Sequence, residues 1–219
     1  MSKLRGNLFG GFTGKLGLSY GRYVHGVNLG AIMPTKRDAA KASAQQKDLM
    51  ERFAALGTLA SGLLSAIRLG LKVAAKTIGP LVSEFDAFVK INKDAVTAEG
   101  GAVEIDYTNL KLAKGTLPQV GFGQADFGEP LTVKLDYAPN SDVPGADVTD
   151  NVYLVVYEPT SKQSVTSAPV QRSAGSISVS LPSTWSGIEV HVYGFAVGNG
   201  TNNKGVISNS TYIGTGIVG

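Results

Sequence analysis

The sequence contains no cysteine and only two histidines, His25 and His191. The absence of cysteine excludes a disulfide framework, thiol catalysis and every cysteine-based metal site. Two histidines leave little for a zinc site. With 43% hydrophobic and 17% charged residues, the composition is that of a folded, globular protein. We therefore expect no metal and no other cofactor.

The chain also lacks a segment that fits a membrane span. The nearest one, residues 53–67, lies between Arg52 and Arg68. It is shorter than the ~20 apolar residues that a bilayer core needs, and it contains glycine, serine and threonine. A buried or interfacial helix is the better interpretation. The charged start, Met1 to Asn7, has no apolar stretch behind it, so we expect no secretory signal and folding in the cytoplasm, which does not exclude release by lysis.

Acidic residues are missing from the first thirty-seven positions, which hold six Lys/Arg and eight glycines. Up to Ala95 the chain has fourteen basic and six acidic residues, and from Val96 it has six basic and eleven acidic ones. A charge of about +8 is thus followed by about −5, which sums to the net +3. A basic, glycine-rich arm ahead of an ordinary domain indicates a segment that binds something other than its own core.

The arm carries a strand pattern. Residues 1–15 are rich in glycine and favour irregular structure. After them, apolar residues alternate with small or polar ones on both sides of His25-Gly26: Leu16, Leu18 and Tyr20 before, Val27, Leu29, Ala31 and Met33 after. This predicts a β-hairpin with strands near 16–24 and 27–33. Because an isolated hairpin is marginal in water, it needs a surface from this chain or from a neighbouring one.

A helical period follows the arm. Thr35 and Asp38 are candidate N-caps, and Ser43 with Gln46 forms a possible capping box. Apolar residues then recur at spacings of four and three: Leu49, Phe53, Leu56, Ala60, Leu63, Ile67, Leu71 and Ala74. They predict one helix of about 35 residues with a continuous apolar stripe.

Glycines interrupt this helix and a proline ends it. Gly57, Gly62 and Gly70 either allow close approach of another helix or mark kinks. Gly79-Pro80 ends the helix and opens a second one, with Pro80 at the first helical position, that runs to about Lys93. The two helices would form a long α-helical hairpin.

Beyond Ala95 the period changes from 3.6 to 2. Candidate strands are 102–107, 110–114, 131–137, 151–158, 163–170, 175–181, 188–197 and 206–217, with turn residues between them. This spacing is typical of an antiparallel β-sandwich of immunoglobulin or fibronectin III type. The fold class is therefore α+β, with an arm (1–37), a helical region (38–95) and a β-sandwich domain (96–219).

Nucleotide-binding motifs fail on their details. The segment 10–15 resembles a phosphate-binding loop, but the pattern needs glycine at position 9 and Ser or Thr at 16, where this chain has Phe9 and Leu16. The segment 214–219 matches a dinucleotide fingerprint in letters only, since no helix follows it. Neither segment predicts a cofactor site.

The sequence offers equally little support for a catalytic site or a metal site. Asp142, Asp147 and Asp150 share one predicted loop, whose spacing differs from an EF-hand, so a solvated loop is favoured over a loose cation site. His191 shares a strand face with Glu189 and has no partners at catalytic spacing, which favours a packed or surface histidine. We expect that the protein is not an enzyme.

Three interpretations of the arm remain open: a solvated terminus, a nucleic-acid arm and a protein-binding arm. Six charges over thirty-seven residues are sparse for phosphate neutralisation, and Arg22 beside Tyr20 and Tyr23 is the nearest basic–aromatic surface. The alternating apolar residues favour packing against protein. The candidate subunit-interface residues are Leu16, Leu18, Tyr20, Arg22, Tyr23, Val27, Leu29, Gly57 and Gly62.

Short segments spread along the chain resemble a known family. They are Gly10–Gly17, Tyr23–Gly26, Phe85–Phe88, Asn92–Thr97, Ile105–Leu110, Leu154–Pro159 and Ser208–Gly214. In this order they are similar to an uncharacterised domain-of-unknown-function family of about this length, found in Bacteroidetes and their phages. Before the hairpin glycine the family usually has Trp-Lys, where this chain has Tyr23-Val24-His25. The resemblance implies architecture and host range, and the family brings no assigned mechanism.

Two functions follow as hypotheses. The arm and the long helix present apolar faces that need partners, which predicts a non-enzymatic structural protein in a many-copy particle. The host range of the family points to a phage virion, as a capsid or tail component, whose partners are copies of the chain and other particle proteins. The alternative is an adhesin-like module that binds a surface or a glycan through loops 139–150 and 198–205.

Overall fold

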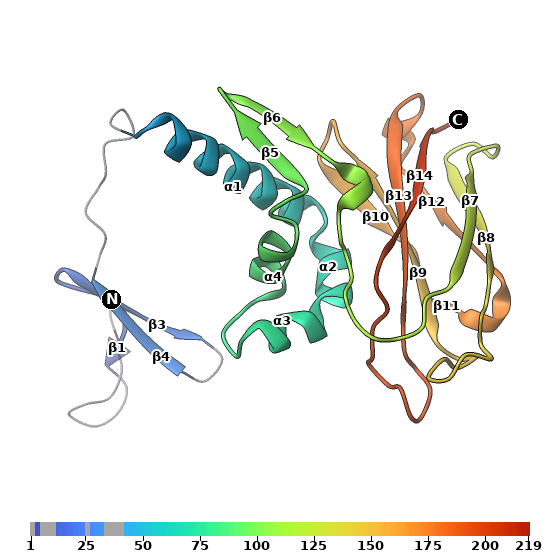
Figure 1. Ribbon diagram of the computed structural model, residues 1–219, viewed down its shortest axis with the longest axis horizontal. Helices are drawn as coiled ribbons and strands as arrows, with labels where there is room; N and C mark the ends of the chain where they lie inside the picture. Colours follow the sequence, from blue (N-terminus) through green and yellow to red (C-terminus); the bar gives the residue numbers. More distant parts are fainter. Residues whose placement is uncertain (1–2, 5–11, 25–26, 33–41) are drawn as a thin grey trace.

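The structure is a computed structural model that describes residues 3–4, 12–24, 27–32 and 42–219. Along the chain it contains a small arm sheet, a group of helices and further antiparallel sheets (Figure 1). Helices and antiparallel strands occur together, which confirms the α+β class.

The arm sheet has four strands instead of the two expected. They are β1 (Lys3–Leu4), β2 (Phe12–Leu16), β3 (Ser19–Val24) and β4 (Val27–Ile32), antiparallel and in that order. β3 and β4 pair as predicted, with Tyr20 opposite Ala31. The prediction was wrong for residues 12–18: β2 ends at Leu16 and a turn follows. Gly17 has a φ of +58°, which glycine adopts without steric cost, so the chain reverses there.

The arm sheet lies apart from the helices in Figure 1. Its described apolar side chains remain open to solvent: Leu18 is 79% exposed and Ile32 is 78% exposed. Tyr20 and Arg22 are exposed as well, while Leu29 is half-buried. The described part of this sheet therefore buries little of its apolar surface within the chain.

The expected single long helix is broken into three pieces. They are α1 (Ala44–Gly62), α2 (Leu64–Gly70) and α3 (Lys72–Ile78), with breaks at Leu63 and Leu71. α1 and α2 are bent by 85° relative to each other. The capping box of Ser43 with Gln46 is confirmed. Thr35 and Asp38 lie outside the described residues.

The second helix begins later than predicted. α4 (Glu84–Ile91) starts after Ser83, whose side chain accepts from the Asp86 N–H in a second capping box. Pro80 is therefore not at a first helical position. A capping box satisfies two otherwise unpaired backbone donors, which outweighs the preference of proline for a helix start.

The breaks occur where the C-terminal strands and loops approach the helices. A Cβ on Gly62 would collide with the Lys162 carbonyl, and one on Gly70 would collide with the Leu112 carbonyl. The Gly62 carbonyl accepts from Ser164 Oγ at 2.6 Å, and the Gly70 carbonyl accepts from the Lys114 N–H at 3.1 Å. Carbonyls released by the breaks are thus satisfied by the C-terminal part of the chain.

Ten strands follow the helices. β5 (Val96–Glu99) and β6 (Ala102–Ile105) pair with each other. One sheet has the order β12-β8-β7, with β7 at Gly121–Asp126, β8 at Thr132–Ala138 and β12 at Ser176–Ser180. The other, which we call the central sheet, has the order β10-β9-β13-β14. Its strands are β9 (Asn151–Glu158), β10 (Gln163–Thr166), β13 (Glu189–Val197) and β14 (Thr211–Ile217), and β11 (Val170–Gln171) also pairs with β9.

The predicted strands differ in accuracy. Those at 131–137, 151–158, 175–181 and 188–197 match observed strands closely. The one at 110–114 is wrong: these residues link other elements, and the Leu112 N–H donates to Ser210 Oγ at 2.9 Å instead of to a strand. Segment 163–170 holds two short strands, and the last strand begins at Thr211 rather than at 206. β5 and β7 were not predicted.

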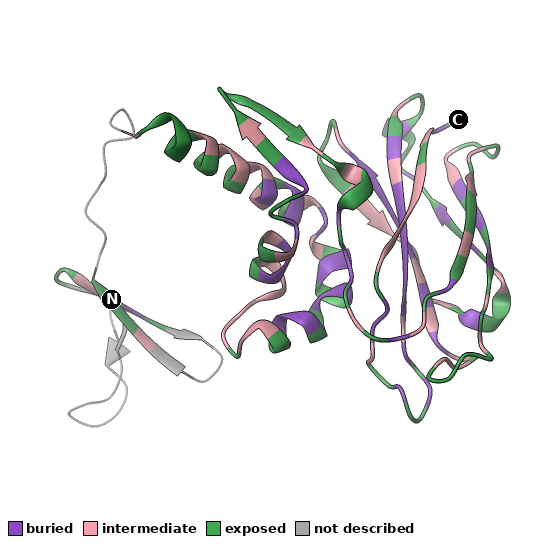
Figure 2. Ribbon diagram, viewed as in Figure 1, coloured by how far each residue is buried: buried purple, intermediate pink, exposed green. Residues whose placement is uncertain are grey.

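Two buried clusters hold the body together. The helix-side core joins helices α1 to α4 to one face of the central sheet and includes Leu63, Phe88 and Tyr193. The inter-sheet core lies between the central sheet and the sheet β12-β8-β7 and includes Leu135 and Val192. Figure 2 shows buried residues along β9, β13 and α2. The helix-side core contains both Ala95 and Val96, so it runs across the predicted domain boundary.

Candidate assembly interface

The first half of α1 presents an apolar surface that nothing described in the chain covers. Leu49 is 60% exposed, Met50 58% and Phe53 62%. Leu49 and Phe53 are four residues apart and so lie on one face of the helix. From Leu56 onward the same stripe enters the helix-side core. We call Leu49, Met50 and Phe53 the apolar end of α1.

The arm sheet brings three of the predicted interface residues together. The strand register aligns Lys15 with Tyr20 and Tyr20 with Ala31, and it aligns Arg22 with Leu29. Residues directly opposite in antiparallel strands share a sheet face. One face of the arm sheet therefore combines Lys15 and Arg22 with Tyr20, Leu29 and Ala31. Leu16, which the alternation grouped with Tyr20, lies opposite Ser19 instead.

The other predicted residues have different positions. Leu18 lies in the turn between β2 and β3, and Leu16, Tyr23 and Val27 are strand residues of β2, β3 and β4. Gly57 and Gly62 lie on α1, away from the arm sheet in Figure 1. Gly62 packs against the backbone of the same chain at Lys162, and a Cβ on Gly57 would lie 3.8 Å from the Phe85 ring. The structure gives both glycines contacts within the chain.

The candidate interface residues taken from the sequence include two glycines of α1 but none of the three residues of its apolar end. The signal was present, because Leu49 and Phe53 are the first two members of the predicted stripe. The stripe alone does not show which of its residues are covered by other elements and which remain exposed. That depends on α4 and the hairpin of β5 and β6, which pack on α1.

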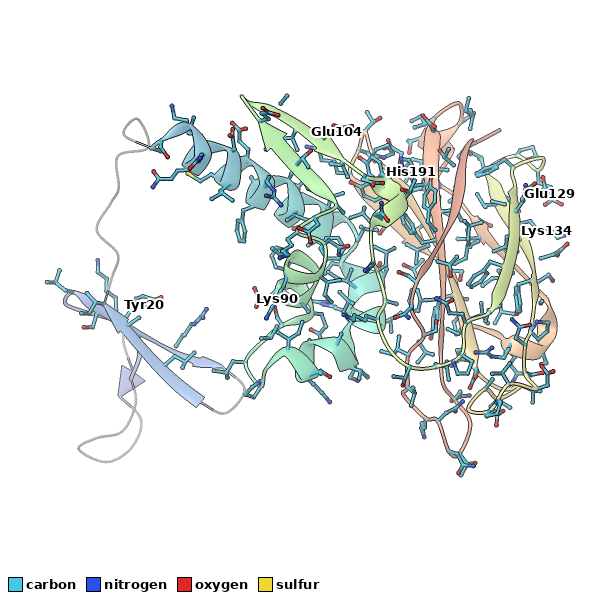
Figure 3. All side chains as sticks on the ribbon, viewed as in Figure 1. Tyr20, Lys90, Glu104, Glu129, Lys134 and His191 are labelled. Carbon is cyan, nitrogen blue, oxygen red and sulfur yellow. The ribbon has the colours of Figure 1, made fainter. Side chains whose placement is uncertain are left out.

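An aromatic pocket of about 500 Å³ lies beside the central sheet. The His191 ring on β13 stacks on Tyr107 with centroids 4.0 Å apart, and its Nδ1 is 3.1 Å from the Tyr212 hydroxyl. The Tyr107 carbonyl accepts from the Tyr193 hydroxyl at 2.8 Å. Glu104 and Asp106 also line the pocket. Figure 3 labels His191 and Tyr20, which lie on either side of the helices.

Burial and hydrogen bonds shift the pKa values of two groups in this pocket. Desolvation lowers the pKa of His191, opposed by the negative charge of Glu189. Hydrogen bonds from Thr108 and Asn109 lower the pKa of Asp106. Burial therefore favours the neutral form of the His191 ring, which is half-buried and packs against Tyr107, one of the two positions, packed or surface, that were expected for it. In the part of the chain that the structure describes, no group of three His, Asp or Glu side chains is arranged to hold a metal ion.

The loop with Asp142, Asp147 and Asp150 is only in part the solvated loop that was expected, because Asp142 is exposed and Asp150 is not. Asp150 is fully buried, and its Oδ2 accepts from Arg172 Nε at 3.1 Å. Arg172 is also fully buried and donates to the carbonyls of Pro118 and Pro139, each at 2.8 Å. A buried charge pair with all its polar groups bonded is stable where an unpaired charge would not be.

The same ion pair ties distant loops together. Asp150 Oδ1 accepts from Asn203 Nδ2 at 2.8 Å and from the Asn199 N–H at 3.2 Å. Asn203 Nδ2 also donates to the Gly145 carbonyl at 3.0 Å. Loops 139–150 and 198–205 thus meet at one end of the two large sheets.

No single helix among the described residues is long and apolar enough to cross a membrane. α1 and α2 pass on length and composition only when taken together, and they are bent by 85°. The bend follows from the break at Leu63, with α2 buried in the helix-side core.

A comparison with known families finds one match, which spans residues 11–214. The chain belongs to DUF6266, a family of unknown function. The match covers the arm from residue 11, the helices, the strands up to β13 and the first four of the seven residues of β14. It confirms the predicted membership of an uncharacterised family of about this length. No curated protein matches the chain.

Proposed function

We propose that this protein is a non-enzymatic structural protein that assembles into a many-copy particle, as a capsid or tail component of a phage virion. The apolar end of α1 carries this proposal. An apolar stripe leaves the helix-side core and continues onto the surface at Leu49, Met50 and Phe53, each more than half exposed. Contiguous exposed apolar surface is typical of protein contact sites.

Energetics favour a protein partner for this surface. Burial of a Leu, Met or Phe side chain contributes about 1.5–3 kcal/mol. The three residues together could therefore supply a large part of a subunit contact. Exposed residues of the arm, among them Leu18 and Ile32, add a second contact surface on a separate element that precedes α1. Two separate surfaces allow each copy to join more than one neighbour.

The choice of a phage particle rests on the sequence resemblance to a family found in Bacteroidetes and their phages. We propose that the two large sheets form an immunoglobulin-like β-sandwich. In immunoglobulin lettering, β7, β8 and β12 are strands A, B and E of one sheet. β10, β9, β13 and β14 are strands C′, C, F and G of the other. Strand C′ thus lies on the sheet of G, F and C, as in variable-type domains.

Introduction of a charge into the apolar end of α1 tests the proposal. Phe53→Lys should abolish or strongly weaken assembly without unfolding the chain, because Phe53 is 62% exposed. Leu69→Lys is the matched control: Leu69 is an exposed apolar residue on α2, and its replacement should leave assembly intact. Light scattering over a range of concentrations measures the mass, and chemical denaturation measures folding. A wild-type chain that stays monomeric at every concentration contradicts the proposal.

Removal of residues 1–32 tests the arm separately. Both cores lie within residues 56–218, so the shortened chain should fold and unfold as the full chain does. It should form smaller assemblies than the full chain, as measured by light scattering and electron microscopy. If the shortened chain forms the same particles, the arm has no part in assembly.

A surface- or glycan-binding module is the second candidate. Its support is the meeting of loops 139–150 and 198–205, which the buried Asp150 side chain joins. Loops at one end of an immunoglobulin-like domain form binding sites in other proteins. Specific binding on a glycan array, lost in Lys204→Glu and kept in Phe53→Lys, would favour this function. Absence of binding by the full chain removes it.

A further inference from the structure

β4 is an unprotected edge strand. Within the described strands, β3 pairs with one side of β4 and nothing pairs with the other. Proteins protect sheet edges by short strands, by charge or by proline. β1 at the opposite edge is two residues long and carries Lys3. β4 has six residues, Val27–Ile32, and none of them is charged or proline.

The turn at Gly17-Leu18 determines which backbone groups of β4 point outward. It joins Leu16 to Ser19, which close a two-residue hairpin and so exchange hydrogen bonds. Because bonding direction alternates along a strand, every second residue of β3 from Tyr20 bonds toward β4. The partners of those residues in β4 are Val27, Leu29 and Ala31. The N–H and C=O groups of the remaining three point to the open edge: Asn28, Gly30 and Ile32.

Charge determines what can approach this edge. β1, β2 and β3 each carry one basic residue, namely Lys3, Lys15 and Arg22, and no acid. A second arm placed against these strands would meet like charge. Against β4 it would meet an uncharged strand. Two arms paired through β4 keep their β3 strands about 14 Å apart, beyond the Debye length of about 8 Å at physiological salt.

We propose that β4 pairs antiparallel with β4 of a second copy around a twofold axis at Gly30. The two arm sheets then form one continuous sheet, with the same strand contributed by each copy. The axis at Gly30 uses all three outward residues, because Asn28 then pairs with Ile32 of the second copy. An axis at Leu29 or at Ala31 leaves one outward residue of each copy without a partner.

Gly30 suits the centre of this contact. It has no side chain, and no atom lies within 4 Å of the position that a Cβ would occupy, so nothing described crowds the sheet face at the proposed axis. Beside it, Leu29 of one copy lies opposite Ala31 of the other, in a pair that does not exchange hydrogen bonds. Side chains of such pairs are the closest across antiparallel strands. The inference rests on the proposed function, because it names one contact through which the copies join.

The absence of cysteine makes a clean cross-linking test possible. Leu29→Cys and Ala31→Cys proteins with different tags are unfolded, mixed in equal amounts, refolded at assembly concentration and oxidised. We expect the mixed disulfide dimer as the dominant product, since Cα atoms in these pairs are about 4.5 Å apart. Each protein alone should cross-link little. Leu18→Cys, at a turn residue that is 79% exposed, controls for random collision.

Two outcomes overturn the proposal. One is mixed cross-linking no greater than that of the Leu18→Cys control. The other is an excess of like-with-like dimers, which would place the axis at Leu29 or Ala31. Gly30→Pro is a second variant, since it removes an outward N–H and leaves the bonds to β3 in place. It should abolish assembly through the arm while the denaturation midpoint stays unchanged, and unchanged assembly would also overturn the proposal.

The test separates this inference from the proposed function. If the wild-type chain forms large assemblies and the β4 cross-link is absent, the inference is wrong and the proposed function stands. If the wild-type chain is monomeric at every concentration, both are wrong.

Discussion

The arm sheet and the central sheet are both antiparallel and both contain apolar strand residues, but their surroundings are opposite. β9 of the central sheet buries Val155 on one face and Val156 on the other, against two different cores. In the arm sheet, Leu18 and Ile32 are more than three-quarters exposed. The local pattern of apolar residues therefore determines that a segment forms a strand, and the rest of the chain determines whether that strand is covered. An uncovered strand of this composition points to a contact outside the chain.

The same contrast occurs within α1. Leu56, Leu59 and Ala60 are buried, while Leu49 and Phe53 one to three turns earlier are exposed. The C-terminal half of α1 is thus part of the core, and its N-terminal half lies on the surface. The predictions below test whether the covered and uncovered regions are energetically as different as the structure indicates.

The largest expected effect comes from matched arginine substitutions. Arg172→Met leaves Asp150 buried without its ion partner, and loss of one partner of a buried pair costs about 3–5 kcal/mol. Arg22→Met in the exposed arm should change the free energy of unfolding by less than about 0.5 kcal/mol. Urea denaturation of the three proteins measures both. Equal midpoints for Arg172→Met and the wild-type chain would contradict the buried network.

Matched glycine substitutions in α1 give the next effect. Gly62→Ala should lower the free energy of unfolding by about 1–3 kcal/mol, because the new Cβ collides with the Lys162 carbonyl. Gly57→Ala should raise it by about 0.5–1 kcal/mol, since alanine favours the helix and Phe85 is 3.8 Å away. Thermal or chemical denaturation gives the sign of each change. A gain in both variants would show that the chain approaches Gly62 less closely.

The smallest effect is the pH dependence of His191. Burial lowers its pKa below the ordinary value of about 6.5. Below that value the unfolded chain takes up a proton that the folded chain does not, so stability falls as the pH decreases. The free energy of unfolding should drop more for the wild type than for His191→Gln between about pH 7.5 and about pH 5.5. NMR titration of His191 should show the lowered pKa directly, and an unshifted pKa would contradict the packing.

Local patterns in the sequence predicted local structure well. The strand at 151–158 follows from its apolar run, and the helix start follows from the Ser43–Gln46 capping box. The stripe from Leu56 to Ala74 correctly named residues of the helix-side core. These features depend on neighbours within a few residues, so the sequence alone contains their causes.

Features that depend on distant partners were not predictable. The sequence marked Gly62 and Gly70 as sites of close approach or kinks, and the helix breaks beside both. No local pattern shows that the approaching segments are those near residues 162 and 112. Asp150 was predicted to lie in a solvated loop because its partner, Arg172, is twenty-two positions away in the sequence. β7 was missed because Gly121 and Gly123 weaken its pattern, although its Phe122 ring packs against Gly194 of the central sheet.

β9 has a consequence for how the protein unfolds. Neighbouring residues of this strand belong to different cores, so a single layer of backbone separates the helices from the outer sheet. Detaching the helices would expose Val155 and Tyr157, and detaching the outer sheet would expose Leu154 and Val156. Neither layer can leave without opening one side of the same strand. Residues 42–219 should therefore lose their structure in one cooperative step, and the amide protons of β9 should be among the last to exchange with solvent.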